Sequence, residues 1–126
     1  MNFVLVDSSV WMDHYRKRND ALVDLLAQDR VLTHPFVIGE IACGTPPSRS
    51  MVLTSLRMMR SVDQATTDEV LEFVNRNQLY GAGCGIVDVS LLASTLITPD
   101  AALWTLDKRL HALASRFNTA YSPVLH

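Results

Sequence analysis

Near its start the chain reads Asn2-Phe3-Val4-Leu5-Val6-Asp7-Ser8-Ser9-Val10-Trp11, an apolar run that ends at a single carboxylate followed by two hydroxyls. A run of this length, closed by Asp-Ser-Ser, predicts a buried strand over residues 2–6 that turns into a helix. In an open α/β sheet, ligands bind beyond the carboxyl ends of the strands. We therefore expect Asp7 to point toward the place where a site would form.

The rest of the chain alternates between short apolar runs and stretches with apolar residues at helical spacing. Such alternation predicts an α/β fold, in which a parallel sheet is covered on both faces by helices. No repeat or linker divides the chain, so a single domain over residues 1–126 is expected. Further strands are expected at 31–33, 101–105 and 119–121. Helices are expected from Ser8 or Ser9 to 15, around 22–26, and at 35–44, 48–59, 68–77 (capped by Thr67), 86–96 and 107–115.

Composition limits the classes of function. The 126 residues are 48% hydrophobic and 19% charged, which is enough apolar material for a core and excludes disorder as the main state. Because the net charge is −2, binding to nucleic acid would need a local basic patch or bound cations. Cys43 and Cys84 match neither a zinc site nor a disulfide framework. With no stretch typical of a signal peptide or of a membrane span, a cytoplasmic protein is expected.

Three more acids stand where the fold does not require a carboxylate. Glu40 lies inside an apolar helix, Asp88 lies at the start of another, and Asp107 leaves the end of a strand as Asp7 does. Four like charges in one pocket are unfavourable unless a divalent cation or protons are bound. Hard oxygen ligands without clustered His or Cys favour Mg²⁺ or Mn²⁺ over zinc.

Each acid also has a structural interpretation. Asp7, Asp88 and Asp107 can be helix caps, and Glu40 can face solvent or pair with an arginine. Asp100 is rejected as the fourth acid, because it precedes the strand at its amino end and therefore lies at the opposite edge of the sheet.

Each of the four acids lies within a short motif. In chain order, the motifs are Asp-Ser-Ser-Val-Trp at 7–11, Phe-Val-Ile-Gly-Glu-Ile-Ala-Cys-Gly at 36–44, Gly-Ile-Val-Asp-Val-Ser-Leu-Leu-Ala-Ser at 85–94 and Leu-Trp-Thr-Leu-Asp-Lys-Arg-Leu at 103–110. These motifs, in this order, resemble those of the PIN-domain nucleases. The chain length and the order of the acids are similar to those of the VapC-type toxin ribonucleases of bacterial toxin–antitoxin pairs. The resemblance covers the chain from Met1 to about Ser115, although residues 45–80 match only in helical character.

The resemblance implies a three-layer α/β/α sandwich with a central parallel sheet, and cleavage of RNA that depends on Mg²⁺ or Mn²⁺. It also implies a homodimer and a cognate antitoxin that often places an arginine in the acidic pocket. The family's acidic residues carry over onto Asp7, Glu40, Asp88 and Asp107, and its small hydroxyl residues near the site carry over onto Ser8 and Thr105.

The expected mechanism divides the work among these residues. Asp7 and Asp88 would hold the principal metal, while Glu40 and Asp107 would complete its shell or help to hold a second ion. Attack by water rather than by the 2′-hydroxyl of RNA leaves 5′-phosphate and 3′-hydroxyl ends. Basic residues from two short clusters are the candidates for contacts with RNA, namely Arg16, Lys17 and Arg18, and Lys108 and Arg109.

Other functions remain open at this point. A PIN nuclease of RNA processing and a catalytically inert module that docks another protein both share this pattern. A phosphatase with Asp7 as nucleophile is disfavoured, because that class resembles Asp-x-Asp and position 9 is Ser. The glycines of Gly81-x-Gly83-x-Gly85 follow a helix rather than a strand, so a dinucleotide site is rejected.

Overall fold

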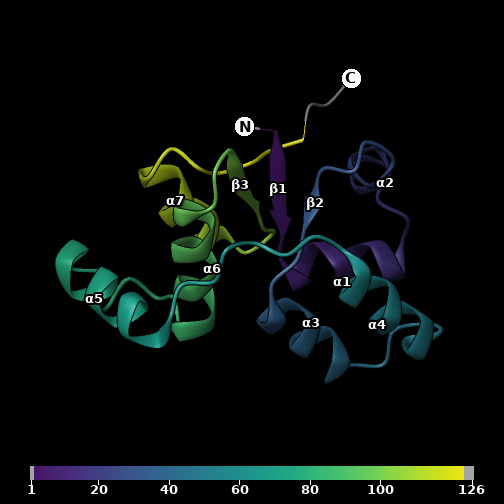
Figure 1. The fold of residues 1–126 in the computed structure, drawn as a ribbon, viewed down its shortest axis with the longest axis horizontal. Helices are drawn as coiled ribbons and strands as arrows, with labels where there is room; N and C mark the ends of the chain where they lie inside the picture. Colours follow the sequence, from purple (N-terminus) through teal and green to yellow (C-terminus); the bar gives the residue numbers. More distant parts are fainter. Residues whose placement is uncertain (1, 124–126) are drawn as a thin grey trace.

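A parallel sheet of three strands lies at the centre of the computed structural model, which describes residues 2–123 (Figure 1). The strands are β1 (Phe3–Val6), β2 (Val31–Leu32) and β3 (Ala101–Trp104), in the order β2-β1-β3. The helices are α1 (Ser8–Arg16), α2 (Asp20–Ala27), α3 (Pro35–Ala42), α4 (Arg49–Met58), α5 (Thr67–Asn77), α6 (Ile86–Ile97) and α7 (Lys108–Arg116).

Helices cover both faces of the sheet. All four residues of β3 are buried, as are Val4, Leu5 and Val6 of β1. Because successive side chains of a strand point to opposite faces, continuous burial means that neither face is open to water. In Figure 1, α1 to α4 lie on the β2 side of the molecule and α5 to α7 on the β3 side. The expected three-layer α/β/α sandwich is confirmed.

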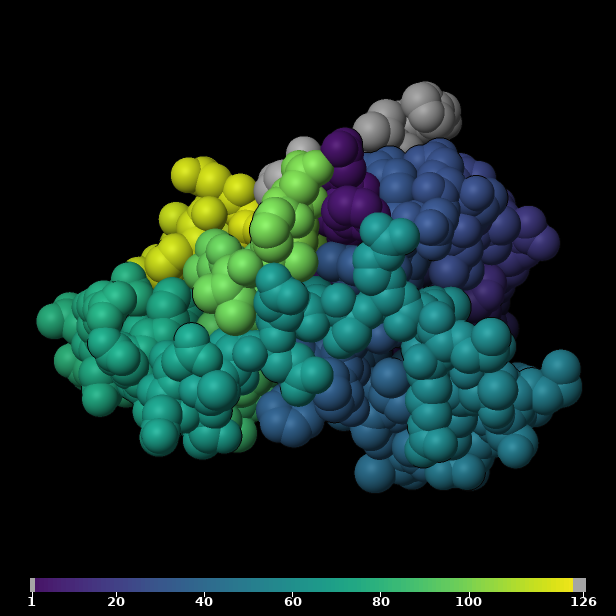
Figure 2. Space-filling view, in the orientation of Figure 1, coloured from purple at the N-terminus to yellow at the C-terminus, as the bar shows by residue number. Residues whose placement is uncertain are grey.

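An extended segment, residues 60–66, connects α4 to α5 and crosses in front of the sheet (Figures 1 and 2). Ser61 forms a parallel bridge with Thr33, just beyond β2. Farther on, the backbone N–H of Asp63 donates to the Thr98 hydroxyl at 2.9 Å, and the backbone N–H of Ala65 donates to the Ser94 hydroxyl of α6 at 3.1 Å. These bonds hold the connection in place although it belongs to no regular element.

The predicted last strand at 119–121 is reduced to a single parallel bridge between Ala120 and Leu103. Backbone bonds on both sides of the bridge support it, from Leu103 to the Thr119 carbonyl and from Tyr121 to the Leu103 carbonyl, each at 2.8 Å. One bridge is too short to count as a strand, although it extends the sheet beside β3.

The helix caps decide between predictions and correct one of them. The N-cap of α1 is Asp7, which confirms the capping interpretation of that residue, and not Ser8 or Ser9. The N-cap of α5 is Thr66 rather than Thr67. The Thr66 hydroxyl accepts from the Glu69 N–H at 3.1 Å, and the Glu69 carboxylate accepts from the Thr66 N–H at 2.9 Å. This reciprocal pair is a capping box, which favours Thr66 because Glu69 then falls at the third helical position.

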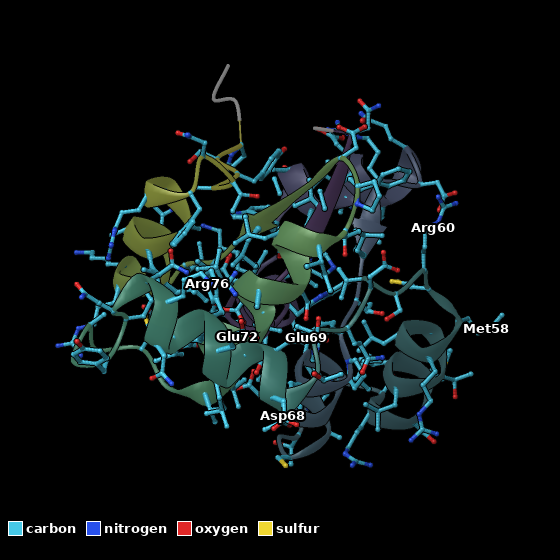
Figure 3. All side chains as sticks on the ribbon, turned by 60° about the vertical axis from the view of Figure 1, so that its left-hand side comes forward. Met58, Arg60, Asp68, Glu69, Glu72 and Arg76 are labelled. Atoms are coloured by element: carbon cyan, nitrogen blue, oxygen red, sulfur yellow. The ribbon has the colours of Figure 1, made fainter. Side chains whose placement is uncertain are left out.

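The outer helices carry exposed charged and apolar side chains. Figure 3 shows Asp68, Glu69, Glu72 and Arg76 along α5, where Arg76 pairs with Glu72 one turn earlier. At the end of α4, Met58 points away from the molecule and is 83% exposed. In residues 2–123, the helices are too short or too polar to cross a membrane.

Candidate active site

Asp7 lies at the carboxyl end of β1 and is only 5% exposed. Its backbone N–H continues the ladder to the Trp104 carbonyl at 2.9 Å, so the strand holds the residue in place. Its Oδ1 accepts from the Ser8 N–H at 2.8 Å, and its Oδ2 accepts from the hydroxyls of Ser9 at 2.8 Å and Thr105 at 2.7 Å. Three donors therefore fix the orientation of one buried carboxylate.

The sheet register explains why Thr105 reaches Asp7. Val6 pairs with Trp104, so the next residue of each strand falls beside the other at the same edge of the sheet. The Thr105 hydroxyl also accepts from the Asp107 N–H at 3.0 Å, which ties the loop after β3 to the same point. Thr105 thus links Asp7 to the segment that carries Asp107.

Ser9 is a site residue that the sequence analysis missed. Besides donating to Asp7, its hydroxyl accepts from the Leu106 N–H at 3.0 Å, across the edge of the sheet. Two adjacent hydroxyls follow Asp7 in the sequence, and their spacing alone does not show which of them bonds to the carboxylate. Ser9, and not Ser8, provides the hydroxyl that contacts Asp7.

Ser8 instead connects Asp7 to Glu40. The Ser8 backbone N–H donates to Asp7, whereas its hydroxyl donates to Oε1 of Glu40 at 3.0 Å. Glu40 lies on α3, which packs against α1 and begins just after β2 with His34 as its N-cap. The Glu40 side chain is exposed, so its carboxylate lies at the open rim of the site.

Asp88 is half-buried in the first turn of α6. Burial raises the pKa of its carboxyl above the usual range, and the negative charges of Asp7, Asp107 and Glu40 raise it further. The Gly85 N–H acts in the opposite direction as a hydrogen-bond donor. Asp88 therefore lies within the electrostatic reach of all three other predicted acids.

Asp107 lies beyond the carboxyl end of β3 and is exposed. It is also the N-cap of α7, since its Oδ1 accepts from the N–H groups of Arg109 at 2.9 Å and Leu110 at 3.0 Å. Asp100 lies at the other end of β3, where its carbonyl accepts from Phe3 N–H. The capping interpretation and the position at the acidic edge thus both hold for Asp107.

The chemistry of the donors fits a hard divalent cation, because carboxylates surround the site and their mutual repulsion is relieved by positive charge. In the described part of the chain, no group of three or more His, Cys, Asp or Glu side chains is already arranged to hold a metal ion. Mg²⁺ commonly binds through one or two carboxylates and keeps several waters, so a closed protein cage is not required. The role of Asp7, Glu40, Asp88 and Asp107 as ligands stays a prediction.

The two basic clusters lie at different distances from the acids. Arg16 ends α1, whose first residue Ser8 is at the site, so nine helical residues place the cluster roughly 13 Å away. Arg18 there pairs with Asp20 at 2.9 Å. Lys108 and Arg109, in contrast, form the first turn of α7 directly after Asp107.

The chain is similar in sequence to known ribonucleases, although no protein-family model matches it. Two curated relatives, both named Ribonuclease VapC32 and from Mycobacterium tuberculosis strains CDC 1551 / Oshkosh and ATCC 25618 / H37Rv, are each 43% identical over 117 residues. The match covers 93% of this chain and 94% of each relative. A PIN-like α/β/α domain with acids at the carboxyl edge of its sheet agrees with this result. The chain belongs to the VapC family of PIN-domain ribonucleases.

Proposed function

We propose that the chain is an endoribonuclease that depends on Mg²⁺ or Mn²⁺ and acts as the toxin of a type II toxin–antitoxin pair. One observation carries the proposal: hydrogen bonds link Asp7 through Ser8 to Glu40 and through Thr105 to the backbone of Asp107, at one edge of the sheet. The charges of these three acids also raise the pKa of Asp88, and the chain matches a ribonuclease along nearly its whole length. A cluster of like charges is costly to build, and a cation-dependent reaction on a polyanion gives it a use.

The proposed metal is held mainly by Asp7 and Asp88, with Glu40 and Asp107 completing or orienting its surroundings. When bound, a divalent ion lowers the pKa of water and neutralises negative charge on the scissile phosphate. The residues of the chain keep the carboxylates in position: Ser9 and Thr105 fix Asp7, and Ser8 holds Glu40 at the rim.

RNA is proposed to enter at the rim, where Glu40 and Asp107 are exposed. Lys108 and Arg109 flank that opening, and they would offset the repulsion between the acids and the RNA backbone. The more distant cluster would contact the RNA only if the bound RNA extended along α1; it consists of Arg16, Lys17 and Arg18. Water attacks the phosphate in this mechanism, so the products carry 5′-phosphate and 3′-hydroxyl ends.

The partners proposed are a cognate antitoxin and a second copy of the chain. The excess negative charge around Asp88 would attract a cationic side chain such as arginine, which agrees with inhibition by an antitoxin that occupies the acidic pocket. The proposed place of action is the cytoplasm, where the RNA would be found.

The proposal is tested by incubating the purified protein with mixed cellular RNAs in Mg²⁺, in Mn²⁺ or in EDTA, followed by analysis of the RNA ends. Cleavage in either metal, loss of cleavage in EDTA and 5′-phosphate ends are expected. Cyclic phosphate ends produced in EDTA would contradict the mechanism. No cleavage under any condition would favour an inert docking module, and cleavage without growth arrest on expression in bacteria would favour an RNA-processing nuclease.

A further inference from the structure

The glycine-rich loop between α5 and α6 has no role in the function proposed so far. Two of its glycines have positive φ, at +76° for Gly81 and +85° for Gly83, a backbone conformation that other residues rarely adopt. The loop leads directly into α6, which carries Asp88 in its first turn.

Gly83 lies directly against the side chain of Arg109. A Cβ atom on Gly83 would lie 2.9 Å from Cδ of Arg109, 3.1 Å from Nη1 and 3.3 Å from Nε. A Cβ on Gly81 would meet no atom within 4 Å. The absence of a side chain at position 83 therefore leaves the space in which the Arg109 side chain is seated. The absence of a side chain at position 81 makes room for no neighbouring group.

The seated side chain bridges the two elements that carry Asp88 and Asp107. The Arg109 backbone N–H donates to Asp107, and its side chain crosses to the loop before α6. Its charge also acts on the Cys84 thiol, whose pKa burial raises first and Asp88 and Asp107 raise further, while Arg109 lowers it. Arg109 thus lies in the same electrostatic environment as these acids.

Within residues 2–123, the guanidinium of Arg109 nevertheless forms neither an ion pair nor a hydrogen bond. Arg18, in contrast, pairs with Asp20, and Arg76 pairs with Glu72. An arginine that is held beside carboxylates without pairing with them keeps its planar set of donors available. That set matches the oxygens of a phosphate in two parallel hydrogen bonds.

We infer that Gly83 seats Arg109 so that its guanidinium binds a backbone phosphate of the RNA at the rim of the acidic site. This inference rests on the proposed function. Arg109 is the binding residue and Gly83 is a positioning residue, since it acts only through Arg109. An added Cβ at position 83 displaces a flexible side chain, so it moves the guanidinium without disrupting the core.

The test measures binding of a fluorescently labelled, random-sequence, single-stranded RNA pool in EDTA at several salt concentrations. Arg109→Ala is expected to weaken binding about tenfold and to reduce the salt slope by about 0.7, the value for one phosphate contact on a single strand. Gly83→Ala is expected to do the same, and the double variant is expected to bind no more weakly than Arg109→Ala alone. Arg109→Lys should restore the salt slope but not the full affinity.

Two matched controls separate the seat from general effects. Gly81→Ala imposes similar backbone strain without a clash, and Arg116→Ala removes an exposed charge in the last turn of α7, at the opposite end of that helix from Arg109. Both variants are expected to bind like the wild type. Binding by Gly83→Ala equal to that by Gly81→Ala would overturn the positioning role, and wild-type binding by Arg109→Ala would overturn the phosphate contact. Either result is compatible with cleavage of RNA by the wild type, so it would contradict only this inference. A wild type that neither binds nor cleaves RNA would contradict the proposed function itself.

Discussion

The Thr105 hydroxyl donates a 2.7 Å hydrogen bond to Oδ2 of Asp7 and joins the carboxyl ends of two neighbouring parallel strands. Both residues are 5% exposed, so water cannot easily replace either partner. Removal of a donor from a buried carboxylate costs more than removal of an exposed one. The bond therefore both supports the fold and fixes the direction in which Asp7 presents its charge.

Thr105→Val is expected to lower the free energy of unfolding by about 1–3 kcal/mol, because Asp7 loses a buried donor. Cleavage of RNA should fall roughly tenfold, the effect of about 1.4 kcal/mol on a reaction barrier. The matched control is Thr119→Val, since the buried Thr119 hydroxyl donates to the Ala101 carbonyl at 3.1 Å, at the amino end of β3. Urea unfolding and initial cleavage rates should show a loss of stability in both variants and a loss of rate only in Thr105→Val. Equal rate losses would mean that Thr105 has no role beyond stability.

Asp88→Asn is expected to stabilise the protein at neutral pH while it removes activity. The pKa of Asp88 is raised in the folded state, mainly by burial and then by Asp7, Asp107 and Glu40, so the folded state binds the proton more tightly than the unfolded state. Stability from this group is therefore present at low pH and is lost as the pH rises from the unfolded pKa through the folded pKa. In thermal unfolding across this range, the melting temperature of Asp88→Asn should increase relative to that of the wild type as the pH rises.

Mg²⁺ provides the control for this linkage. A cation in the acidic site would offset the repulsion at Asp88, so added Mg²⁺ should raise the melting temperature of the wild type at neutral pH. The same addition should have a smaller effect on Asp88→Asn. A wild type and variant with parallel pH profiles, and with equal responses to Mg²⁺, would show that Asp88 is not coupled to the other acids.

Asp107→Asn and Asp100→Asn compare the two ends of β3. Asn caps a helix about as well as Asp, so Asp107→Asn should keep α7 stable. Asp100 has a φ of +60°, which Asn tolerates. We expect cleavage to fall at least tenfold in Asp107→Asn and to stay within about twofold of the wild type in Asp100→Asn. A larger loss of cleavage in Asp100→Asn than in Asp107→Asn would contradict the assignment, because it would identify Asp100, at the amino end of β3, as the fourth acid.

The strands and the choice of Asp107 over Asp100 followed from patterns that act locally. An apolar run predicts a buried strand, and a parallel sheet places the carboxyl ends of its strands at one edge. These two patterns were sufficient to predict that Asp7 and Asp107 lie at that edge. The capping box moved the start of α5 to Thr66 because two side chains, and not one, decide where that helix begins.

The partners of the hydroxyl side chains were not predictable in the same way. Whether Ser8 or Ser9 contacts Asp7 depends on where the first turn of α1 meets the loop after β3, which the sequence of α1 alone does not specify. The contact between Gly83 and Arg109 joins residues far apart in the chain, and its signal is the absence of a side chain. Such contacts depend on how α6 and α7 pack, so they became visible only in three dimensions.

The central claim is that Asp7 is a metal ligand at the shared edge of β1 and β3. Calorimetric titration of Mn²⁺ into the wild type and into Asp7→Asn tests it most directly, with circular dichroism to verify that both are folded. We predict saturable binding by the wild type and affinity at least tenfold weaker in the variant, because a neutral amide replaces the carboxylate. Equal Mn²⁺ affinity in the two proteins, or no binding by the wild type, would contradict the claim.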